Sequence, residues 1–480
     1  MSYFDGSEKC MAELTDGSEK CIICGMKRES YISKLESWVR SSRRKPLILE
    51  GARQVGKTWL MQEFAKAHFQ NVIYARFDKD KILRNIFTKD FDLGRIVRDL
   101  QIRFNATIDP KNTILLFDEI QSCKDAITAL KYFCEDRPDL SVIAAGSLLG
   151  LEFRDDEQEG DEKGDAEETT GFPVGKVNIL EVHPFSFVEY LDAIGEGRLA
   201  DCIRQGEWET IATFKDRLTD LLKHYYVVGG MPEAVDAYRR TQNFREVREI
   251  HREILKGYQR DISKHAPKSD VPKIELCWNS IPAQLAKENK KFIYAALKKG
   301  GRSSEFRGPL RWLEDAGLIG RVKRVTMPSL PLDGYADGAF KVFLLDVGLL
   351  STMSGLSPEV VLEGSRIFSE FKGALTEQYV YQQLKAETEL EPYYYSQEDS
   401  QCEVDFLVQL GMNVCPLEVK AEENVRSQSL KSYRTKFKPV RAFRASMKDY
   451  KEQDQLVNLP LVGVQRVGLG EKVSDFKVKG

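Results

Sequence analysis

The stretch Gly51-Ala52-Arg53-Gln54-Val55-Gly56-Lys57-Thr58 decides how the first part of this chain folds. It fits the pattern G-x-x-x-x-G-K-[ST], in which successive backbone N–H groups curl around an anion. Pro46–Glu50, just before it, has the apolar composition of a short buried strand, and Trp59–Ala65, just after it, has helical spacing. Because the motif requires a strand, a loop and a helix in this order, we predict a phosphate-binding loop.

Two residues of this loop carry the predicted chemistry. Lys57 would reach the β- and γ-phosphates of ATP, and the Thr58 hydroxyl would ligate Mg²⁺. The residues before them would offer backbone N–H groups at the start of the following helix, where the helix dipole also favours an anion. The alternative is a chance glycine-rich turn in front of a helix.

A second motif, Ile114-Leu115-Leu116-Phe117-Asp118-Glu119, predicts a central strand that ends in two carboxylates. Asp118 would hold the metal through its water shell, and Glu119 would orient or deprotonate the attacking water. Such a strand is common alone, but after a phosphate loop it indicates a nucleoside triphosphatase with ATP and Mg²⁺ as cofactors. A third strand, Ser141–Ala145, is followed by Ser147, which either senses the γ-phosphate or forms a simple turn.

Strands and helices alternate through this region. Asn71–Phe77 is predicted as a further strand, and Phe91–Phe104 has apolar residues at helical spacing. This alternation predicts an α/β fold with a doubly wound parallel sheet, which we assign to a P-loop ATPase domain over residues 28–198.

The bulk composition is that of an ordinary protein without a basic excess. The 480 residues are 42% hydrophobic and 30% charged, with a formal net charge of −3. Nucleic-acid binding would therefore need a local basic patch. No apolar run approaches the ~20 residues of a membrane span. The scattered cysteines predict reduced thiols in a cytoplasm, and we expect no membrane partner.

The first 27 residues repeat the segment Asp-Gly-Ser-Glu-Lys-Cys. We expect residues 1–27 to be a disordered leader, and Met26 would make a sensible translation start. The alternative is a metal site formed by Cys10, Cys21 and Cys24, although one C-x-x-C pair without a second pair or a histidine is a weak zinc signal.

Residues 199–330 are predicted to be a helical and winged-helix region. Two glycines and a proline in Gly229–Pro232 predict a sharp turn between helices. The winged helix would comprise helices around Phe292–Lys298 and Phe306–Ala316 and the strand Leu318–Val325. Its basic side chains would either meet phosphates or lie on a packing lid; they are Arg307, Arg311, Arg321, Lys323 and Arg324.

Residues 331–480 are predicted to form a restriction-endonuclease-like α/β domain. Asp405 begins one strand, and Glu418 and Lys420 end the next, so the two carboxylates could share one Mg²⁺ while Lys420 positions a water. Glu377 could approach from a preceding helix. This D…E-x-K order is that of restriction-type nucleases, and the alternative is a nuclease-like scaffold that cuts nothing.

The chain resembles, over about residues 28–445, a large prokaryotic family of AAA-type ATPases whose C-terminal domain of unknown function looks like the PD-(D/E)XK nuclease fold. The resemblance implies an AAA-type core that binds ATP and Mg²⁺ at the phosphate loop and at Asp118-Glu119. In Pro173–Lys176, a lysine stands where many members have an arginine, and it cannot make the planar contact of an arginine finger. Besides the phosphate loop, the motifs that carry the resemblance are Leu115–Glu119, Gly229–Glu233, Asp346–Leu350, Lys372–Val380 and Glu403–Lys420.

Three functions follow from these patterns. The first is an ATP-hydrolysing switch or motor that relays its nucleotide state to the nuclease-like module, and the second is an ATP-regulated, Mg²⁺-dependent nuclease. Whichever function holds, the AAA-type module could form a nucleotide-dependent homo-oligomer. The third function is a nucleotide-controlled protein that binds DNA or a partner protein. Its contact face would be Lys431, Arg434, Lys436, Lys438, Arg441 and Arg444.

Overall fold

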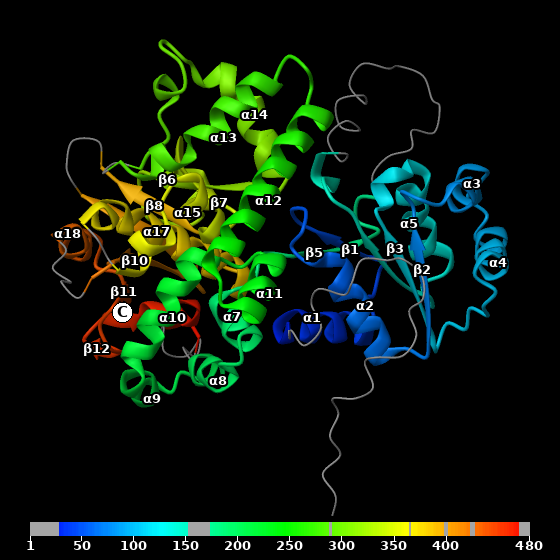
Figure 1. Cartoon of the computed structure of the whole chain (residues 1–480), viewed down its shortest axis with the longest axis horizontal. Helices are drawn as coiled ribbons and strands as arrows, with labels where there is room; N and C mark the ends of the chain where they lie inside the picture. Colours follow the sequence, from blue (N-terminus) through cyan, green and yellow to red (C-terminus); the bar gives the residue numbers. More distant parts are fainter. Residues whose placement is uncertain are drawn as a thin grey trace, which may run out of the picture.

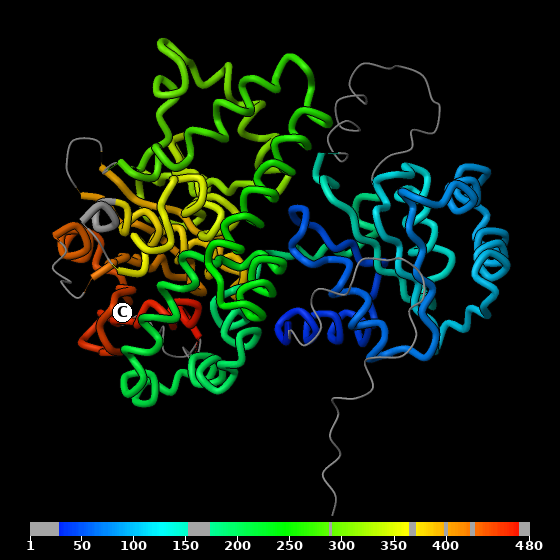
Figure 2. Tube along the Cα trace, viewed as in Figure 1, coloured from blue at the N-terminus to red at the C-terminus, as the bar shows by residue number. Residues whose placement is uncertain are grey.

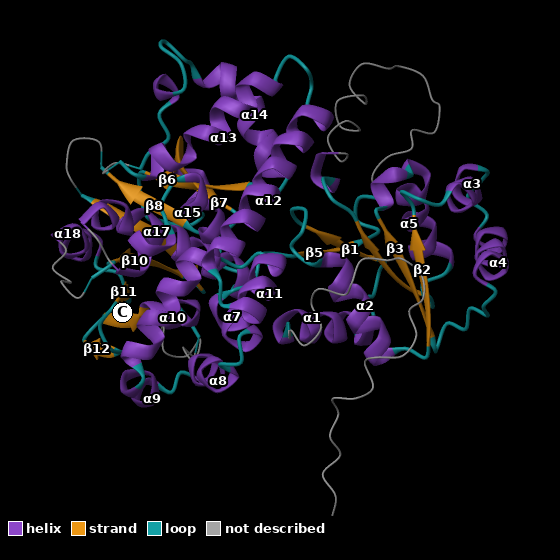
Figure 3. Ribbon diagram, in the orientation of Figure 1, coloured by secondary structure: helices purple, strands orange, loops and turns teal. Residues whose placement is uncertain are grey.

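This computed structural model describes residues 28–151, 173–287, 290–363, 366–397, 402–422 and 428–469. The expected leader and its alternative metal site lie outside the described residues. Figure 1 and Figure 2 show two bodies side by side. We call the part of the chain from Glu29 to Glu181 the first body and the part from Phe187 onward the second body. Each contains one β-sheet flanked by helices, as Figure 3 shows.

The first body contains a five-stranded sheet in the order β2-β3-β4-β1-β5. All of its neighbouring strands pair in parallel, so the predicted α/β fold with a parallel sheet is confirmed. Its elements are β1 (Leu47–Glu50), β2 (Asn71–Arg76), β3 (Thr113–Asp118), β4 (Ser141–Ala145), β5 (Asn178–Glu181), α1 (Glu29–Arg40), α2 (Lys57–His68), α3 (Lys81–Thr88), α4 (Leu93–Phe104) and α5 (Lys124–Asp136), with a 3₁₀ turn at Ile120–Ser122.

Alternate residues of the central strand β3 pack on opposite faces of this sheet. Ile114 and Leu116 belong to one buried cluster, and Leu115 and Phe117 belong to another. This is the pattern of a parallel strand that is covered by helices on both sides, and it explains the uninterrupted apolar run in the sequence. The carboxyl ends of β1, β3 and β4 therefore meet at one edge of the sheet.

The middle of the chain is helical. Its helices are α7 (Phe187–Ala193), α8 (Gly197–Gln205), α9 (Trp208–Thr213), α10 (Lys215–Val228), α11 (Pro232–Thr241), α12 (Phe244–His265), α13 (Val271–Leu285) and α14 (Ser303–Asp315). In Figure 1, α12 crosses the middle of the molecule, on the side of the second body that faces the first.

The predicted turn between α10 and α11 depends on its two glycines. Gly229 has a φ of +66°, and a Cβ atom there would lie 2.2 Å from Oδ1 of Asp346. A Cβ atom on Gly230 would lie 2.1 Å from the carbonyl oxygen of Phe185, and the Gly230 N–H donates to Asp346 at 2.6 Å. Asp346 also accepts from the Leu349 N–H at 2.9 Å, so this buried carboxylate holds the glycine turn and caps the helix that follows it.

The second body contains an eight-stranded mixed sheet in the order β12-β13-β11-β10-β9-β8-β6-β7. Its strands are β6 (Ile319–Val325), β7 (Ala336–Leu344), β8 (Tyr393–Ser396), β9 (Glu403–Leu410), β10 (Asn413–Val419), β11 (Ala442–Ser446), β12 (Lys451–Gln453) and β13 (Leu456–Pro460). Its helices are α15 (Val347–Met353), α16 (Pro358–Glu363), α17 (Arg366–Glu387) and α18 (Gln428–Phe437), with 3₁₀ turns at Leu332–Tyr335 and Leu461–Arg466.

The structure differs from the predicted winged helix at the first of its two helices. Instead of a helix over residues 292–298, the structure has one 3₁₀ turn, Tyr294–Ala296. The reason is tertiary, because the Phe292 N–H donates to Phe340 of β7 at 2.8 Å and the side chain of Gln284 bonds both backbone groups of Ile293. The strand expected at 318–325 is β6, and it pairs with β7 and β8. The boundary expected after residue 330 thus falls between two paired strands of one sheet.

Candidate functional site

The predicted phosphate loop runs from the end of β1 to the start of α2. Its backbone is left-handed at three positions, with φ values of +136° at Gly51, +66° at Gln54 and +93° at Gly56. A Cβ atom on Gly51 would lie 2.3 Å from the carbonyl oxygen of Val182, so glycine is required where the loop passes the end of β5. The helix α2 begins at Lys57, directly after the loop.

Lys57 is buried within this loop. Its Nζ donates to the carbonyl oxygens of Gly51 and Ala52, both at 2.7 Å. Burial lowers the pKa of Lys57 to about 8, and the carboxylates of Glu119 and Asp118 oppose this shift only in part. The amino group is therefore held inside the loop, where an anionic ligand would favour its charged form.

Asp118 ends β3 directly opposite Thr58. The Thr58 hydroxyl donates to the two carboxylate oxygens of Asp118 at 3.2 and 3.1 Å, and the Tyr74 hydroxyl donates to the same carboxylate at 2.6 Å. Burial raises the pKa of Asp118. A hydroxyl and a carboxylate this close form the oxygen pair that binds Mg²⁺ beside phosphates, so these residues fit that ion. The sequence did not indicate Tyr74.

Glu119 and Ser147 also meet at this edge of the sheet. Gln121 donates through its Nε2 atom to Glu119 at 2.5 Å and to the Ser147 hydroxyl oxygen at 3.2 Å, and that hydroxyl lies 3.5 Å from Glu119. The Arg53 Nε donates to the same hydroxyl at 3.1 Å. Sequence reasoning missed Gln121, whose only signal is its position two residues after Glu119.

Arg53 ties the phosphate loop to the second body. Its guanidinium forms an ion pair with Asp261 of α12, and its carbonyl oxygen accepts from the Tyr258 hydroxyl at 2.9 Å. On the other side of the loop, Gly317, between α14 and β6, is so close that a Cβ atom there would lie 3.0 Å from the Ala52 nitrogen. The loop is thus held from two directions by elements far along the chain.

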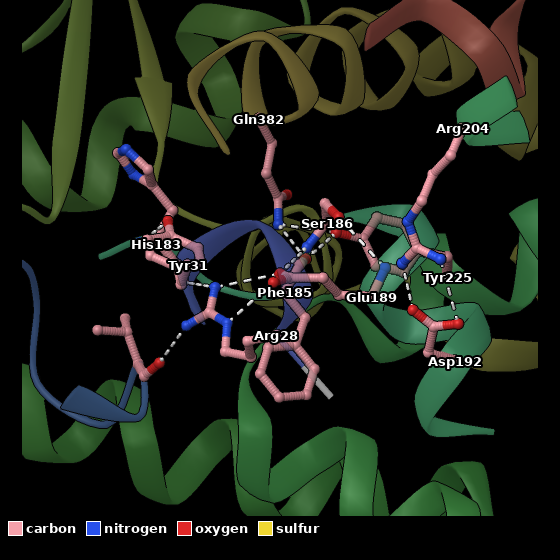
Figure 4. A network of polar contacts seen from close by, with 11 residues as sticks. Arg28, Tyr31, His183, Phe185, Ser186, Glu189, Asp192, Arg204, Tyr225 and Gln382 are labelled. Carbon is pink, nitrogen blue, oxygen red and sulfur yellow. Dashed lines mark hydrogen bonds and ion pairs between the residues drawn. The ribbon is translucent and has the colours of Figure 1, made fainter. Parts of the chain in front are cut away.

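A buried polar network anchors the loop from a third side (Figure 4). The Arg28 guanidinium donates to the Val55 carbonyl oxygen at 3.1 Å, to the His183 carbonyl oxygen at 2.8 Å and to Glu189 at 3.0 and 3.1 Å. Glu189 in turn forms a reciprocal capping box with Ser186 at the start of α7. The network therefore links the loop to the segment that leads into the second body.

The four residues predicted for a nuclease-like site come together in the second body. Lys420 Nζ lies 2.8 Å from Glu418, and the Val419 N–H donates to Asp405 at 2.8 Å. Glu377 of α17 is also buried there, and its negative charge contributes to raising the pKa of Asp405, after the larger effect of burial. The order of Glu377, Asp405, Glu418 and Lys420 along the chain therefore indicated side chains that lie close together in the structure.

Two lysines that the sequence analysis missed lie among these carboxylates. The fully buried Lys341 of β7 lies 2.6 Å from Glu403, 3.6 Å from Glu377 and 4.0 Å from Asp405. Lys290 forms an ion pair with Glu377. Although burial opposes ionisation, these two ammonium groups lower the pKa of Glu377 to about 2. Lys341 stands inside the apolar run from Phe340 to Leu344, which could have indicated a buried lysine, but nothing local indicated its partners.

The expected Mg²⁺ position at Asp405 and Glu418 fits this arrangement poorly. Ammonium groups already lie beside the carboxylates that would have to bind the ion. Across the described ranges, no group of three or more His, Cys, Asp or Glu side chains is arranged to hold a metal ion. We therefore derive no step through a metal at this cluster.

The basic residues expected to meet phosphates have different surroundings. Arg321, Lys323 and Arg324 of β6 form ion pairs with Glu314, Asp333 and Asp337. Arg307 and Arg311 of α14 are exposed. In the C-terminal set, Arg441 pairs with Glu452 at 2.5 Å. Lys176, the lysine at the end of the Pro173–Lys176 segment, forms an ion pair with Glu135, and its Nζ lies 2.8 Å from the carboxylate.

Comparison with known families assigns the first body. Residues 43–191 match the family model described as an AAA domain. Residues 219–360 and 372–462 match two domains of unknown function, DUF8612 and DUF4143. No curated protein matches the chain. In the part that the structure describes, no helix combines the length and the apolar character needed to cross a membrane.

Solved structures resemble the chain only distantly. The Walker-type ATPase PABY2304 of Pyrococcus abyssi is 15% identical, with a TM-score of 0.41, over 68% of this chain and 95% of that chain. The Orc1 protein of Aeropyrum pernix, solved in complex with DNA, is 13% identical, with a TM-score of 0.26, over 69% of this chain and 92% of that chain. Cdc6p of Pyrobaculum aerophilum is 11% identical, with a TM-score of 0.27, over 71% of this chain and 95% of that chain.

The parallel sheet and the loop at its edge define a P-loop nucleotide-binding fold. Together with the family match over residues 43–191, they identify the first body as an AAA-type domain.

Proposed function

We propose that this protein binds and hydrolyses ATP, and that its nucleotide state controls the second body. The observation that carries this proposal is the contact between the Thr58 hydroxyl and the Asp118 carboxylate, beside the buried ammonium of Lys57. These groups bring a cation, oxygen ligands and a helix amino terminus to one point, which suits a triphosphate.

Each residue at this edge has a distinct task in the proposal. Lys57 contacts the β- and γ-phosphates, and Thr58 and Asp118 hold Mg²⁺, which supplies charge neutralisation when bound. Glu119 orients or deprotonates the attacking water. Ser147 senses the γ-phosphate, since its hydroxyl lies within hydrogen-bonding distance of both Gln121 and Arg53.

Arg53 and α12 relay the nucleotide state in this proposal. Arg53 contacts Ser147 on one side and Asp261 on the other. At its opposite end, α12 is joined to α15, because Arg248 donates to Ser351 at 2.7 Å and His251 bonds Thr352 at 3.0 Å. Gln382 of α17 in turn accepts from the Val347 N–H at 2.9 Å. A shift of Arg53 could thus reach α17, which carries Glu377.

The test is an ATPase assay on the wild-type protein and on Glu119→Gln. We expect the variant to bind ATP normally and to hydrolyse it about 10²–10⁴-fold more slowly, which is the usual contribution of a general base. Glu63→Gln, on the exposed side of α2, is the control and should keep full activity. If Glu119→Gln hydrolyses ATP at the wild-type rate, the proposed role of this residue is wrong. Size measurement with and without ATP tests the proposed nucleotide-dependent homo-oligomer.

An ATP-regulated nuclease is the second candidate. It is supported by the convergence of Glu377, Asp405, Glu418 and Lys420, and it is opposed by Lys290 and Lys341, whose ammonium groups lie beside Glu377 and Asp405. These contacts favour the scaffold alternative, in which the cluster stabilises the second body. Cleavage of DNA or RNA by the wild-type protein that is lost in Asp405→Ala would establish the nuclease, whereas an unchanged rate in that variant would exclude the cluster as its centre.

A further inference from the structure

The carboxyl-terminal half of α12 exposes a row of three cations. Lys256, Arg260 and Lys264 are all exposed and recur at every fourth residue. Because an α-helix rises ~1.5 Å per residue, they follow one another in steps of about 6 Å along one side of the helix. Together with Gln259 and Ser263, they line a shallow, open stretch of the helix surface. We call these five residues the α12 row.

The three cations have no anionic partner within the described ranges. No ion pair or hydrogen bond joins their side chains to any residue that the structure describes, in contrast to the paired basic residues of β6. The acidic residues Glu249 and Glu253 lie nearer the start of the helix, beside Arg252, which we leave out of the row for that reason. Like charges at this spacing destabilise a helix, and an anionic partner would offset that effect.

The chemistry of the row identifies the class of partner. Of its two polar members, Gln259 can donate hydrogen bonds to phosphate oxygens through its side-chain amide, whereas the Ser263 hydroxyl donates to the Gln259 carbonyl oxygen at 3.0 Å. In this half of the helix Tyr258 and Ile262 are buried, Leu255 is half-buried, and His265 beside Lys264 is exposed. None of the five members of the row is aromatic or aliphatic, so the row itself lacks the apolar anchors that protein interfaces use, the apolar face that a membrane surface needs, and an aromatic platform on which single-stranded bases stack.

We propose that the α12 row binds the phosphate backbone of a nucleic-acid duplex, independently of its base sequence. The protein as a whole carries a net charge of −3, so this contact depends on a local row of cations and not on the overall charge. The duplex follows the row as a line of regularly spaced phosphates.

The same helix also contacts the phosphate loop. Tyr258 and Asp261, which lie between members of the row in sequence, both bond Arg53. A duplex on the row therefore lies on the helix that holds the loop, and it alters the ATPase rate. This second statement rests on the proposed ATPase function, whereas the binding itself does not.

The experiment measures binding of a fluorescent 20-base-pair DNA duplex to the full chain by anisotropy, without ATP, over a series of salt concentrations. Its variant is Lys256→Gln, Arg260→Gln and Lys264→Gln together. Losing three phosphate contacts should reduce the slope of log K against log salt by about 2.7 and weaken binding at least tenfold at low salt. The control, Lys79→Gln with Lys89→Gln and Lys111→Gln, removes the same charge from exposed sites on the first body and should bind like the wild type.

Several results would overturn the assignment. These are no binding by the wild type, an equal loss in both triple variants, or no loss in the α12 variant while its circular dichroism shows it folded. A single strand of equal length that binds more tightly than the duplex, or poly-glutamate that binds the row when the duplex does not, would also overturn it. If the duplex binds through the row but the protein does not hydrolyse ATP, the proposed function fails and the surface assignment stands.

Discussion

At the scale of the residue, the phosphate loop depends on one buried ammonium group. Lys57 bonds two carbonyl oxygens of its own loop, and these bonds preorganise the loop before any ligand is present. The same contacts place the charge where no water competes for it, so each phosphate contact gains strength from the low local dielectric.

Replacing Lys57 should abolish nucleotide binding. We expect Lys57→Ala to weaken ATP binding by at least about 100-fold, because a charge-assisted contact in a buried site is lost. Isothermal titration calorimetry measures this. Lys66→Ala, an exposed position on the same helix, is the matched control and should bind normally. Undiminished ATP affinity in a folded Lys57→Ala protein would contradict the assigned role.

ATP affinity should also fall at alkaline pH. Without a ligand, the pKa of Lys57 is about 8, so between pH 7.5 and pH 9 its charged fraction decreases about eightfold, and the apparent affinity should decrease with it. Calorimetry in buffers of different ionisation enthalpy should show proton uptake on binding at pH 9. An affinity that stays constant over this range, with no proton uptake, would contradict the burial of this group.

The lowered pKa of Lys57 affects the stability of the fold in the opposite direction, because stability increases as the pH rises. Because the folded pKa of Lys57 lies below its ordinary value of 10.5, the unfolded chain binds more protons between about pH 8 and pH 10.5. As the pH rises from about 8 to 10.5, the contribution of Lys57 to the free energy of unfolding therefore increases. As the pH falls back to about 8, that contribution is lost.

At the scale of the element, β7 and α17 meet through a buried charge cluster. Lys341 lies among three carboxylates and over the ring of Tyr394, 4.9 Å from its centroid. Removing one member of a buried ionic cluster leaves the others uncompensated. The cluster should therefore stabilise the second body as a unit.

We expect Lys341→Met to lower the free energy of unfolding by about 3–5 kcal/mol, which is the usual effect of breaking a buried ion pair. Urea denaturation measures it, and adding Glu403→Gln should recover part of the loss. The control is Lys323→Met on the neighbouring strand, where an exposed pair with Asp333 is worth at most about 1 kcal/mol. Equal losses in the two variants, or stabilisation of the wild type by Mn²⁺, would contradict the scaffold role.

At the scale of the whole molecule, the phosphate loop lies where the two bodies meet. Arg28, Asp261 and Gly317 reach it from three directions. A loop held in this way cannot change its shape without shifting its neighbours, because packed interiors transmit strain. The second body is therefore placed to respond to the nucleotide.

The contact between Arg53 and Asp261 should carry this response. In Asp261→Ala we expect ATP still to bind. The change that ATP causes in amide hydrogen exchange along α12 should be reduced at least about twofold, as for a coupling of 0.5–2 kcal/mol. Hydrogen-exchange mass spectrometry measures the change. Asp220→Ala, an exposed position on α10, is the control. A full response in Asp261→Ala would exclude this contact as the relay.

Local sequence determined the parts of this protein that depend on short-range geometry. The loop Gly51–Thr58, the strand that ends in Asp118 and the helical middle region follow from hydrophobic spacing and from glycines that the backbone requires. The convergence of Glu377, Asp405, Glu418 and Lys420 followed from their order on adjacent elements.

Only the tertiary structure decided which distant groups complete these sites. The partners of Arg53, the position of Lys341 among carboxylates and the pairing of β6 with β8 each join residues far apart in the chain. The turn in place of a helix at residues 294–296 has the same origin, since long-range hydrogen bonds outweighed local propensity there. Such pairings depend on how whole elements pack together, and no local pattern of residues encodes that.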